Sequence, residues 1–330
     1  MPSNTASWSE GWRPAAANDG WTYRDRVVPR EAGLSVSAFY AGRHRHSDQS
    51  LWKTRLAAGE IERNGRPLHD DPPLAAGDRL AWHRPPWREE AVPAAWAVVH
   101  DDGDLLVIDK PAGLPVLPAG GFLEHTVLRL LERRHAQDPA GVPRPVHRLG
   151  RFTSGLLVCA RQPTTRAWLS ARLRESTAAA PAGGEDQERS GCRKLYRALL
   201  EPGALALSLG QELVIAVPIG RRPHPRLGWI WCAAHDPGPG DLAARSTLTL
   251  VERQPRADLV QVAIASGRPH QIRIHAAAAG APLLGDPLYR PGGAARAEAL
   301  PGDGGYVLQA WRLELTRPDG GHLRLQAPPS

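Results

Sequence analysis

Arginine and histidine side chains gather at two places where a loop meets a regular element. Arg148 and Arg151 stand just before a predicted strand, and His270 and Arg273 stand at the beginning of a predicted helix. Guanidinium and imidazole groups are well suited to bind phosphate. The alternative is that these side chains only solvate the ends of loops. Both interpretations are open on side-chain type alone.

The helix that carries the second group is expected over Pro269–Ala279, where the proline at an early position removes an N–H that has no partner in a helix. His270 and Arg273 are three residues apart, so they share one face of this helix. The free N–H groups and the dipole at the helix start add to their positive field. The sequence therefore favours a phosphate group as the ligand here.

The elements that must position these groups are mostly strands. A hairpin is expected from residues 97–100 and 105–109, and an amphipathic helix is expected over Thr126–Arg134. Further strands are expected at 156–160, 195–200, 213–217, 247–252, 259–265 and 307–315. Because helices and strands mix without a regular βαβ cadence, we expect an α+β fold with a mixed sheet.

Composition narrows the class of protein. The 330 residues include 41 Lys and Arg against 34 Asp and Glu, a formal net charge of +7 that favours a polyanionic partner. No apolar run approaches the roughly 18 residues of a membrane-spanning helix, and the first thirty residues lack the apolar core of a secretory signal. The three cysteines lie too far apart for a zinc site. We expect a cytoplasmic protein without a metal.

A proline-rich segment, His83–Pro93, divides the chain into two parts. The part before it predicts two short helices, over 34–41 and 50–58. These are followed by a strand that enters a turn at Asn64 and Gly65, a strong hairpin signal. The part after it holds the strands and both basic groups.

Four motifs in this second part resemble, in the same order, those of the RluA-type RNA pseudouridine synthases. They are VVHDDGDLLVIDKPAGLPV, HRLGRFTSGLL, KLYRALL and GRPHQIRIHAAAAGAPLLGDPLY, and the resemblance runs over nearly all of Ala97–Gln326. It implies the pseudouridine synthase fold, a mixed and largely antiparallel sheet with a central cleft. It also implies a uridine of ribosomal or transfer RNA as substrate, and neither a metal nor an organic cofactor.

The resemblance assigns roles to single residues. Arg148 corresponds to the arginine that enters the base stack beside the flipped nucleotide. Tyr196 corresponds to the tyrosine that stacks on the base, and Arg273 to the arginine that pairs with the nucleophilic aspartate. Further RNA contacts are expected from the remaining polar residues of the two basic groups, Arg151, Arg268, His270 and Gln271.

One position departs from the family pattern. Gly150 stands where the HRLD motif has its nucleophilic aspartate, and glycine has no side chain that could attack or transfer a proton. Either another carboxylate serves, with Asp109, Glu124 and Asp286 as candidates, or the protein binds RNA without the chemistry. We favour the synthase. In both cases a buried Arg273 should have an anionic partner.

The first part of the chain resembles the ribosomal-protein S-four-like RNA-binding module. The resemblance rests on GLSVSAFYAGRHRHSDQSLWKTRLAAGEIERNGRP and on LAAGDRL further along. We therefore predict that residues 1–92 form this module with an N-terminal extension and a linker, and that residues 93–330 form the catalytic domain. A purely structural cap is the alternative for the first part. A monomer is expected.

Overall fold

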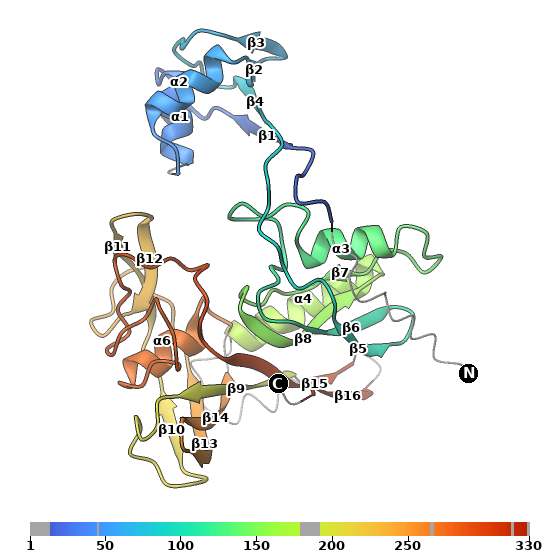
Figure 1. Ribbon diagram of the computed structural model, residues 1–330, viewed down its shortest axis with the longest axis vertical. Helices are drawn as coiled ribbons and strands as arrows, with labels where there is room; N and C mark the ends of the chain where they lie inside the picture. The colour runs from blue at the N-terminus through green and yellow to red at the C-terminus, as the bar shows by residue number, and fades with distance from the viewer. Residues whose placement is uncertain (1–13, 45, 179–191, 265–266, 318–319, 329–330) are drawn as a thin grey trace. The chain divides into compact units, whose positions relative to one another are not determined.

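The computed structural model describes residues 14–44, 46–178, 192–264, 267–317 and 320–328 (Figure 1). The chain forms two compact units, one over Ala15–Glu90 and one that holds the chain from Ala91 onward. None of the described helices is long and apolar enough to cross a membrane.

The smaller unit has a four-stranded sheet in the order β1-β4-β2-β3, with two helices. Its elements are β1 (Trp21–Arg26), η1 (Pro29–Glu31), α1 (Val36–Arg43), α2 (Gln49–Ala57), β2 (Ile61–Arg63), β3 (Arg66–Leu68) and β4 (Arg79–Arg84). Asp48 caps α2 by accepting a hydrogen bond from the Leu51 N–H at 2.8 Å. Tyr40, Trp52 and Trp82 are almost completely buried and form the centre of its core.

The larger unit is built on a ten-stranded sheet in the order β10-β13-β14-β9-β15-β8-β6-β5, with β16 beside β15 and β7 beside β8. Among its described strand pairs, β15 and β8 run parallel and the others antiparallel. The strands are β5 (Ala97–Asp101), β6 (Leu105–Lys110), β7 (Arg144–Pro145), β8 (Thr153–Ala160), β9 (Cys192–Leu200), β10 (Glu212–Ile215), β13 (Ser246–Gln254), β14 (Ala257–Ile264), β15 (Leu308–Thr316) and β16 (His322–Gln326). The expected mixed, largely antiparallel sheet is confirmed.

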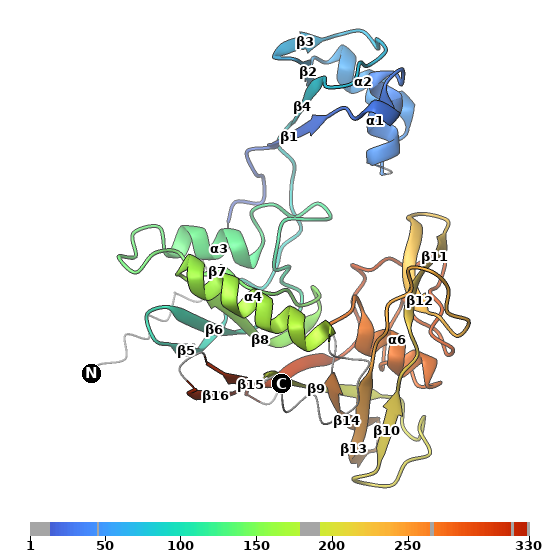
Figure 2. The same ribbon diagram turned by 180° about the vertical axis from the view of Figure 1, so that it is seen from behind.

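Helices α3 (Val127–Arg134) and α4 (Pro163–Ala178) cover opposite faces of one half of this sheet (Figure 2). Ile108 packs against α3 and Val107 against the α4 side, because successive residues of a strand point to opposite faces. Helix α6 (Gln271–Ala278) packs against the other half and against the hairpin of β11 (Ile219–His224) and β12 (Gly228–Ala233).

Candidate active site

The loops that follow β6 and precede β8 are fastened to each other by a buried lysine. Lys110 donates hydrogen bonds to the carbonyl oxygens of Pro111, Leu114 and Arg151 at 2.8, 2.9 and 3.0 Å. Arg151 also exchanges two hydrogen bonds with Gly113, one through its backbone carbonyl and one through Nε. Burial lowers the pKa of Lys110 to about 7. The KPAG loop therefore fixes the backbone next to position 150.

The two arginines of the HRLG segment lie in different surroundings. The Arg151 guanidinium lies over the rings of Phe122 and Phe152, at 4.5 and 4.9 Å from their centres. This side chain therefore makes cation–π contacts within the protein. Arg148 is exposed. Its charge contributes to lowering the pKa of His270, so the two basic groups predicted from the sequence lie within electrostatic range of each other.

The start of α6 is held by an unusual backbone conformation. His270 has a φ of 53°, in the left-handed region that few non-glycine residues adopt. Its Nδ1 lies 2.7 Å from the Tyr289 hydroxyl, which donates to the Trp231 carbonyl. Burial, followed by the charges of Arg273 and Arg148, lowers the pKa of His270 to about 4. This imidazole is therefore neutral at neutral pH.

Gln271 and Arg268 form hydrogen bonds with the segment that leads into β13. Gln271 is 3 % exposed, and its amide nitrogen donates to the Arg245 carbonyl at 2.9 Å and to Ser246 Oγ at 3.0 Å. Its amide oxygen accepts a hydrogen bond from the Arg268 N–H, and Arg268 Nε donates to the Ala243 carbonyl. Both side chains thus join the start of α6 to the chain that enters β13.

Arg273 has the anionic partner that was expected for it. Its Nε and Nη2 each donate to a different oxygen of Asp286 at 2.7 Å, and the two side chains are 4 % and 0 % exposed. The Leu288 N–H donates to the same carboxylate at 2.8 Å. Asp286 raises the pKa of Arg273 against the opposing effect of burial. Asp286 is therefore committed to holding Arg273.

The other two candidate acids, Asp109 and Glu124, have different surroundings. Asp109 alternates with Ile108 and Lys110, so it points to the α4 face of β6, whereas Leu149 packs on the α3 face. Glu124 forms an ion pair with Arg133 at 2.6 Å. Asp109 thus faces the opposite side of the sheet from Leu149, and Glu124 is held by Arg133.

Tyr306, a residue that the sequence motifs do not single out, lies beside Gly150. Gly150 is exposed, and its φ lies outside the left-handed region. A Cβ atom on Gly150 would lie 3.2 Å from both the Tyr306 hydroxyl and Thr153 Oγ1. The Arg273 guanidinium lies 4.2 Å from the centre of the Tyr306 ring. Tyr306 therefore connects position 150 with Arg273.

Two glycines bring Tyr306 to this place. A Cβ on Gly304 would overlap the Phe152 ring of the HRLG segment. Gly305 has a φ of 127°, and a Cβ there would lie 2.6 Å from the Gly285 carbonyl oxygen. Only residues without a side chain allow the backbone to pass so close to both loops. The Gly-Gly-Tyr sequence before β15 was the available signal.

Tyr196 lies in the middle of the sheet, beside both halves of the core. It is half-buried on β9, paired with Ala310 of β15, and packs against the clusters that contain Leu149 and Tyr306. Burial raises the pKa of Tyr196 to about 12, so its hydroxyl stays protonated at neutral pH.

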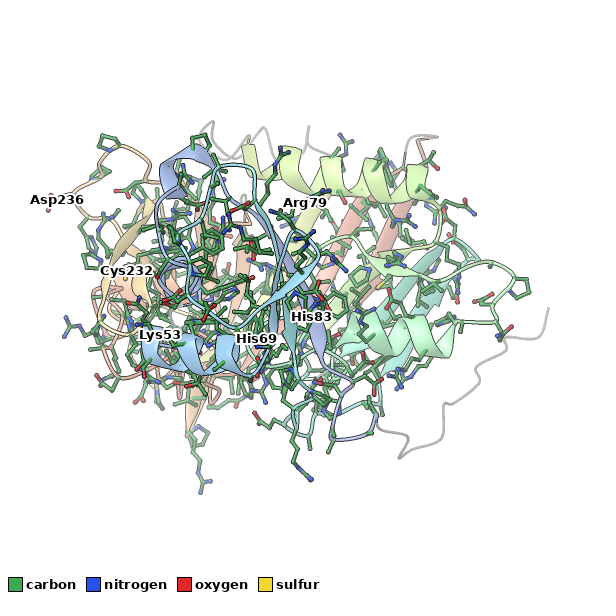
Figure 3. The ribbon with its side chains drawn as sticks, turned by 90° about the horizontal axis from the view of Figure 1, so that it is seen from above. Lys53, His69, Arg79, His83, Cys232 and Asp236 are labelled. Carbon is green, nitrogen blue, oxygen red and sulfur yellow. The ribbon has the colours of Figure 1, made fainter. Side chains whose placement is uncertain are left out.

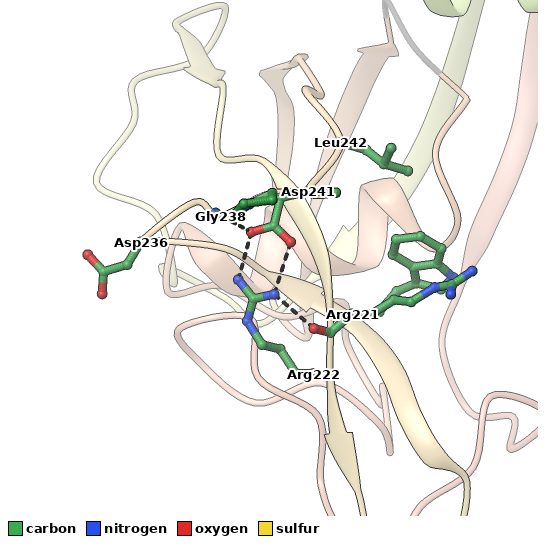
Figure 4. A pocket seen from close by; sticks show the side chains of 9 residues that line it. Arg221, Arg222, Asp236, Gly238, Asp241 and Leu242 are labelled. Atoms are coloured by element: carbon green, nitrogen blue, oxygen red, sulfur yellow. Dashed lines mark hydrogen bonds and ion pairs between the residues drawn. The ribbon is translucent and has the colours of Figure 1, made fainter.

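A hollow of about 680 Å³ lies elsewhere on this unit, beside the β11–β12 hairpin. Figure 4 shows Arg222 and Asp241 facing each other in it, with both guanidinium–carboxylate bonds at 3.0 Å. Arg221 lies over Trp229 and contributes to its rim. The hollow contains none of the candidate site residues. Among the described residues, no group of three or more His, Cys, Asp or Glu side chains could hold a metal ion.

Comparison with known proteins identifies the family. Residues 104–278 match the family model of RNA pseudouridylate synthases. The chain belongs to this family. It is 40 % identical over 277 residues to an uncharacterized RNA pseudouridine synthase of Synechocystis, which covers 83 % of this chain and 87 % of the relative.

Two further relatives and one solved structure agree. RNA pseudouridine synthase 5 of Arabidopsis thaliana is 37 % identical, covering 90 % of this chain and 89 % of its own. Ribosomal large subunit pseudouridine synthase D of Nitrosomonas europaea is 33 % identical, covering 73 % and 63 %. Human RNA pseudouridylate synthase domain containing 1 shares the fold, with a TM-score of 0.52 at 20 % identity over 73 % of this chain and 86 % of that one. The protein is an RNA pseudouridine synthase of the RluA type, an isomerase, and the pure RNA-binding alternative is not favoured.

Proposed function

We propose that this synthase isomerises a uridine in ribosomal or transfer RNA at a reaction centre bounded by Gly150, Tyr196 and Arg273. The observation that supports this most strongly is the convergence of separate motifs on position 150. Lys110 fastens the KPAG loop to the HRLG segment, and Tyr306 joins that segment to Arg273. A site assembled from several segments and held by buried bonds is typical of a catalytic centre.

The side chains at this centre divide the work. Tyr196 stacks on the flipped uracil, since its ring is half-buried and its hydroxyl stays neutral. Exposed Arg148 enters beside the flipped nucleotide and contacts phosphate. Among the expected RNA contacts, Arg268 and Gln271 position the backbone through their internal hydrogen bonds.

The same proposal assigns RNA binding to the smaller unit. His46 lies in the field of Arg55 and Arg84, which together with burial lower the pKa of His46. The Arg55 guanidinium lies over the rings of Trp52 and Trp82 at 4.3 and 4.8 Å. Lys53 lies on the exposed side of α2 (Figure 3). A group of neighbouring basic side chains favours a phosphate partner.

We infer that the enzyme acts in the cytoplasm as a monomer without a metal. Its three cysteines are free and buried, which suits a reducing compartment. The groups assembled at position 150 all belong to one chain. The Asp286 carboxylate at this centre is bound to Arg273, and the described residues contain no group of side chains that could hold a metal ion.

The test is a map of pseudouridine in the RNA of the host organism with and without the gene. We expect one or a few sites in ribosomal or transfer RNA to lose the modification. The purified protein should then restore it on RNA extracted from the deletion strain. Identical maps, together with no conversion of that RNA, would overturn the proposal.

A further inference from the structure

The place of the missing aspartate is lined by two hydroxyl groups. The Tyr306 hydroxyl and Thr153 Oγ1 both lie 3.2 Å from where a Cβ of residue 150 would stand. That distance is shorter than an ordinary van der Waals contact with carbon. Gly150 therefore leaves room for the tip of Tyr306, and the two positions are matched to each other.

The Tyr306 ring is fixed, but its hydroxyl is not used by the protein. The residue is 6 % exposed, with Arg273 at 4.2 Å from the ring centre and Phe152 edge-on at 6.5 Å. Within the described parts of the chain, the hydroxyl makes no hydrogen bond, and it is not one of the buried polar atoms without a partner, so its oxygen reaches the solvent. A fixed ring with a free hydroxyl beside exposed Gly150 is arranged to meet something that enters from outside.

A positive charge is fixed beside the Tyr306 ring, at 4.2 Å from its centre. Arg273 stays protonated because Asp286 holds it through two hydrogen bonds. Tyrosine can serve as a covalent nucleophile, and a tyrosine attacks the anomeric carbon in some glycosidases.

We propose that Tyr306 is the nucleophile of this enzyme and takes the part that a carboxylate at position 150 has in its relatives. This inference rests on the proposed function. It moves the reacting atom from the HRLG segment to Tyr306. This residue precedes β15, near the C-terminal end of the chain, and its hydroxyl lies beside Gly150.

The step balances without a cofactor. Tyr306 gives its hydroxyl proton to water, and the phenolate oxygen attacks C1′ of the flipped uridine. The C1′–N1 bond breaks, and its electron pair leaves with the uracil anion. After the base turns, C5 attacks C1′ and the C1′–O bond returns its electron pair to Tyr306. The phenolate then takes the proton from C5, and water returns a proton to N1.

The experiment compares pseudouridine formation by the full-length wild type, Tyr306→Phe and Gly150→Asp/Tyr306→Phe, with Tyr23→Phe as a matched loss of a hydroxyl in the other unit. We expect Tyr306→Phe to lower the turnover number at least about a hundredfold, with unchanged RNA affinity and an unchanged unfolding curve. The double variant should regain at least about tenfold, since it returns a carboxylate to the position that carries it in the family. Tyr306→Phe within threefold of the wild type would overturn the inference.

A second measurement does not depend on how the Phe variant folds. Replacing residue 306 by 3-fluorotyrosine keeps the ring but makes the phenol more acidic, so the pH profile of turnover should move to lower pH. The charged or titratable groups near it, Arg273 with its partner Asp286 and Tyr289, stay unaltered. An unmoved profile contradicts the nucleophile role. A wild type that forms no pseudouridine overturns the proposed function as well, whereas an active wild type with an active Phe variant removes only this inference.

Discussion

The two buried cations beside position 150 are held in contrasting ways. Lys110 directs three hydrogen bonds to backbone carbonyls, and burial lowers its pKa to about 7. Arg273 binds a buried carboxylate with two hydrogen bonds, and its pKa is raised. Lys110 thus holds the backbone of the KPAG loop, an arrangement that we call the Lys110 clasp, and can lose its charge near neutral pH. The α6 side keeps its charge and holds it against Tyr306.

The largest effect is expected from breaking the α6 side. Asp286→Asn leaves the Arg273 cation buried without a counter-charge, which should lower the free energy of unfolding by about 3–5 kcal/mol. Urea unfolding measures this. The control is Asp241→Asn at the partly exposed Arg222 pair, which should cost far less (Figure 4). Equal losses in the two variants would show that burial does not set the strength of the Arg273 pair.

Lys110→Met tests how much the three hydrogen bonds of the Lys110 clasp stabilise the fold. It leaves three carbonyls without their donor and should lower the free energy of unfolding by about 1–3 kcal/mol at neutral pH. The loss should also grow with pH. Between pH about 7 and 10.5 the unfolded wild type binds a proton that the folded state has released, so wild-type stability rises with pH. The variant lacks this group.

Urea unfolding of both proteins at pH 6, 7.5 and 9 checks the sign. The stability of the wild type relative to Lys110→Met should increase along this series. A constant difference would mean that Lys110 has the same affinity for protons in the folded and unfolded states.

Arg148→Gln and Arg151→Gln distinguish a residue that contacts RNA from one that holds the protein backbone in place, within the same HRLG segment. Arg148 is exposed, so its loss should weaken RNA binding and reduce the slope of log K against log salt by about 1. Arg151 binds Gly113 and two phenylalanine rings, so its loss should lower stability and leave the salt slope unchanged. Filter binding over a salt series distinguishes them. Equal slopes for the two variants would contradict the division.

The smallest catalytic effect is expected from removing residues 1–90. The remaining chain has its own cores and should fold. We expect the KM for RNA to rise while the turnover number at saturating RNA stays the same, because the groups at position 150 all lie in the larger unit. Steady-state kinetics on full-length RNA measures both. An unchanged KM would favour a structural cap.

Local signals predicted α1, α2, α3 and α6 but not α4 (Pro163–Ala178), the longest of the described helices. Helix α3 begins at Val127 because Thr126 caps it, as its sequence suggests. The helix expected from Pro269 begins at Gln271, since His270 takes a left-handed conformation that no local pattern reveals. The sequence also singled out Arg273, as the partner of the nucleophile, and Asp286, as a candidate catalytic acid. That these two residues bind each other depends on the fold. Tyr306 follows a glycine-rich stretch typical of a loop, and its contact with Gly150 is set by tertiary packing.

The central claim is that this chain, in which Gly150 stands where the family motif predicts the nucleophilic aspartate, still isomerises uridine. The most direct measurement is tritium release from RNA labelled at C5 of uridine, because the new carbon–carbon bond displaces the C5 hydrogen. A family member with aspartate in its HRLD motif serves as positive control, and ribosomal and transfer RNA from a host without the gene as substrates. We predict release by the purified wild type, in amounts that match the pseudouridine formed. No release from either RNA, while the control enzyme releases tritium, would contradict the account.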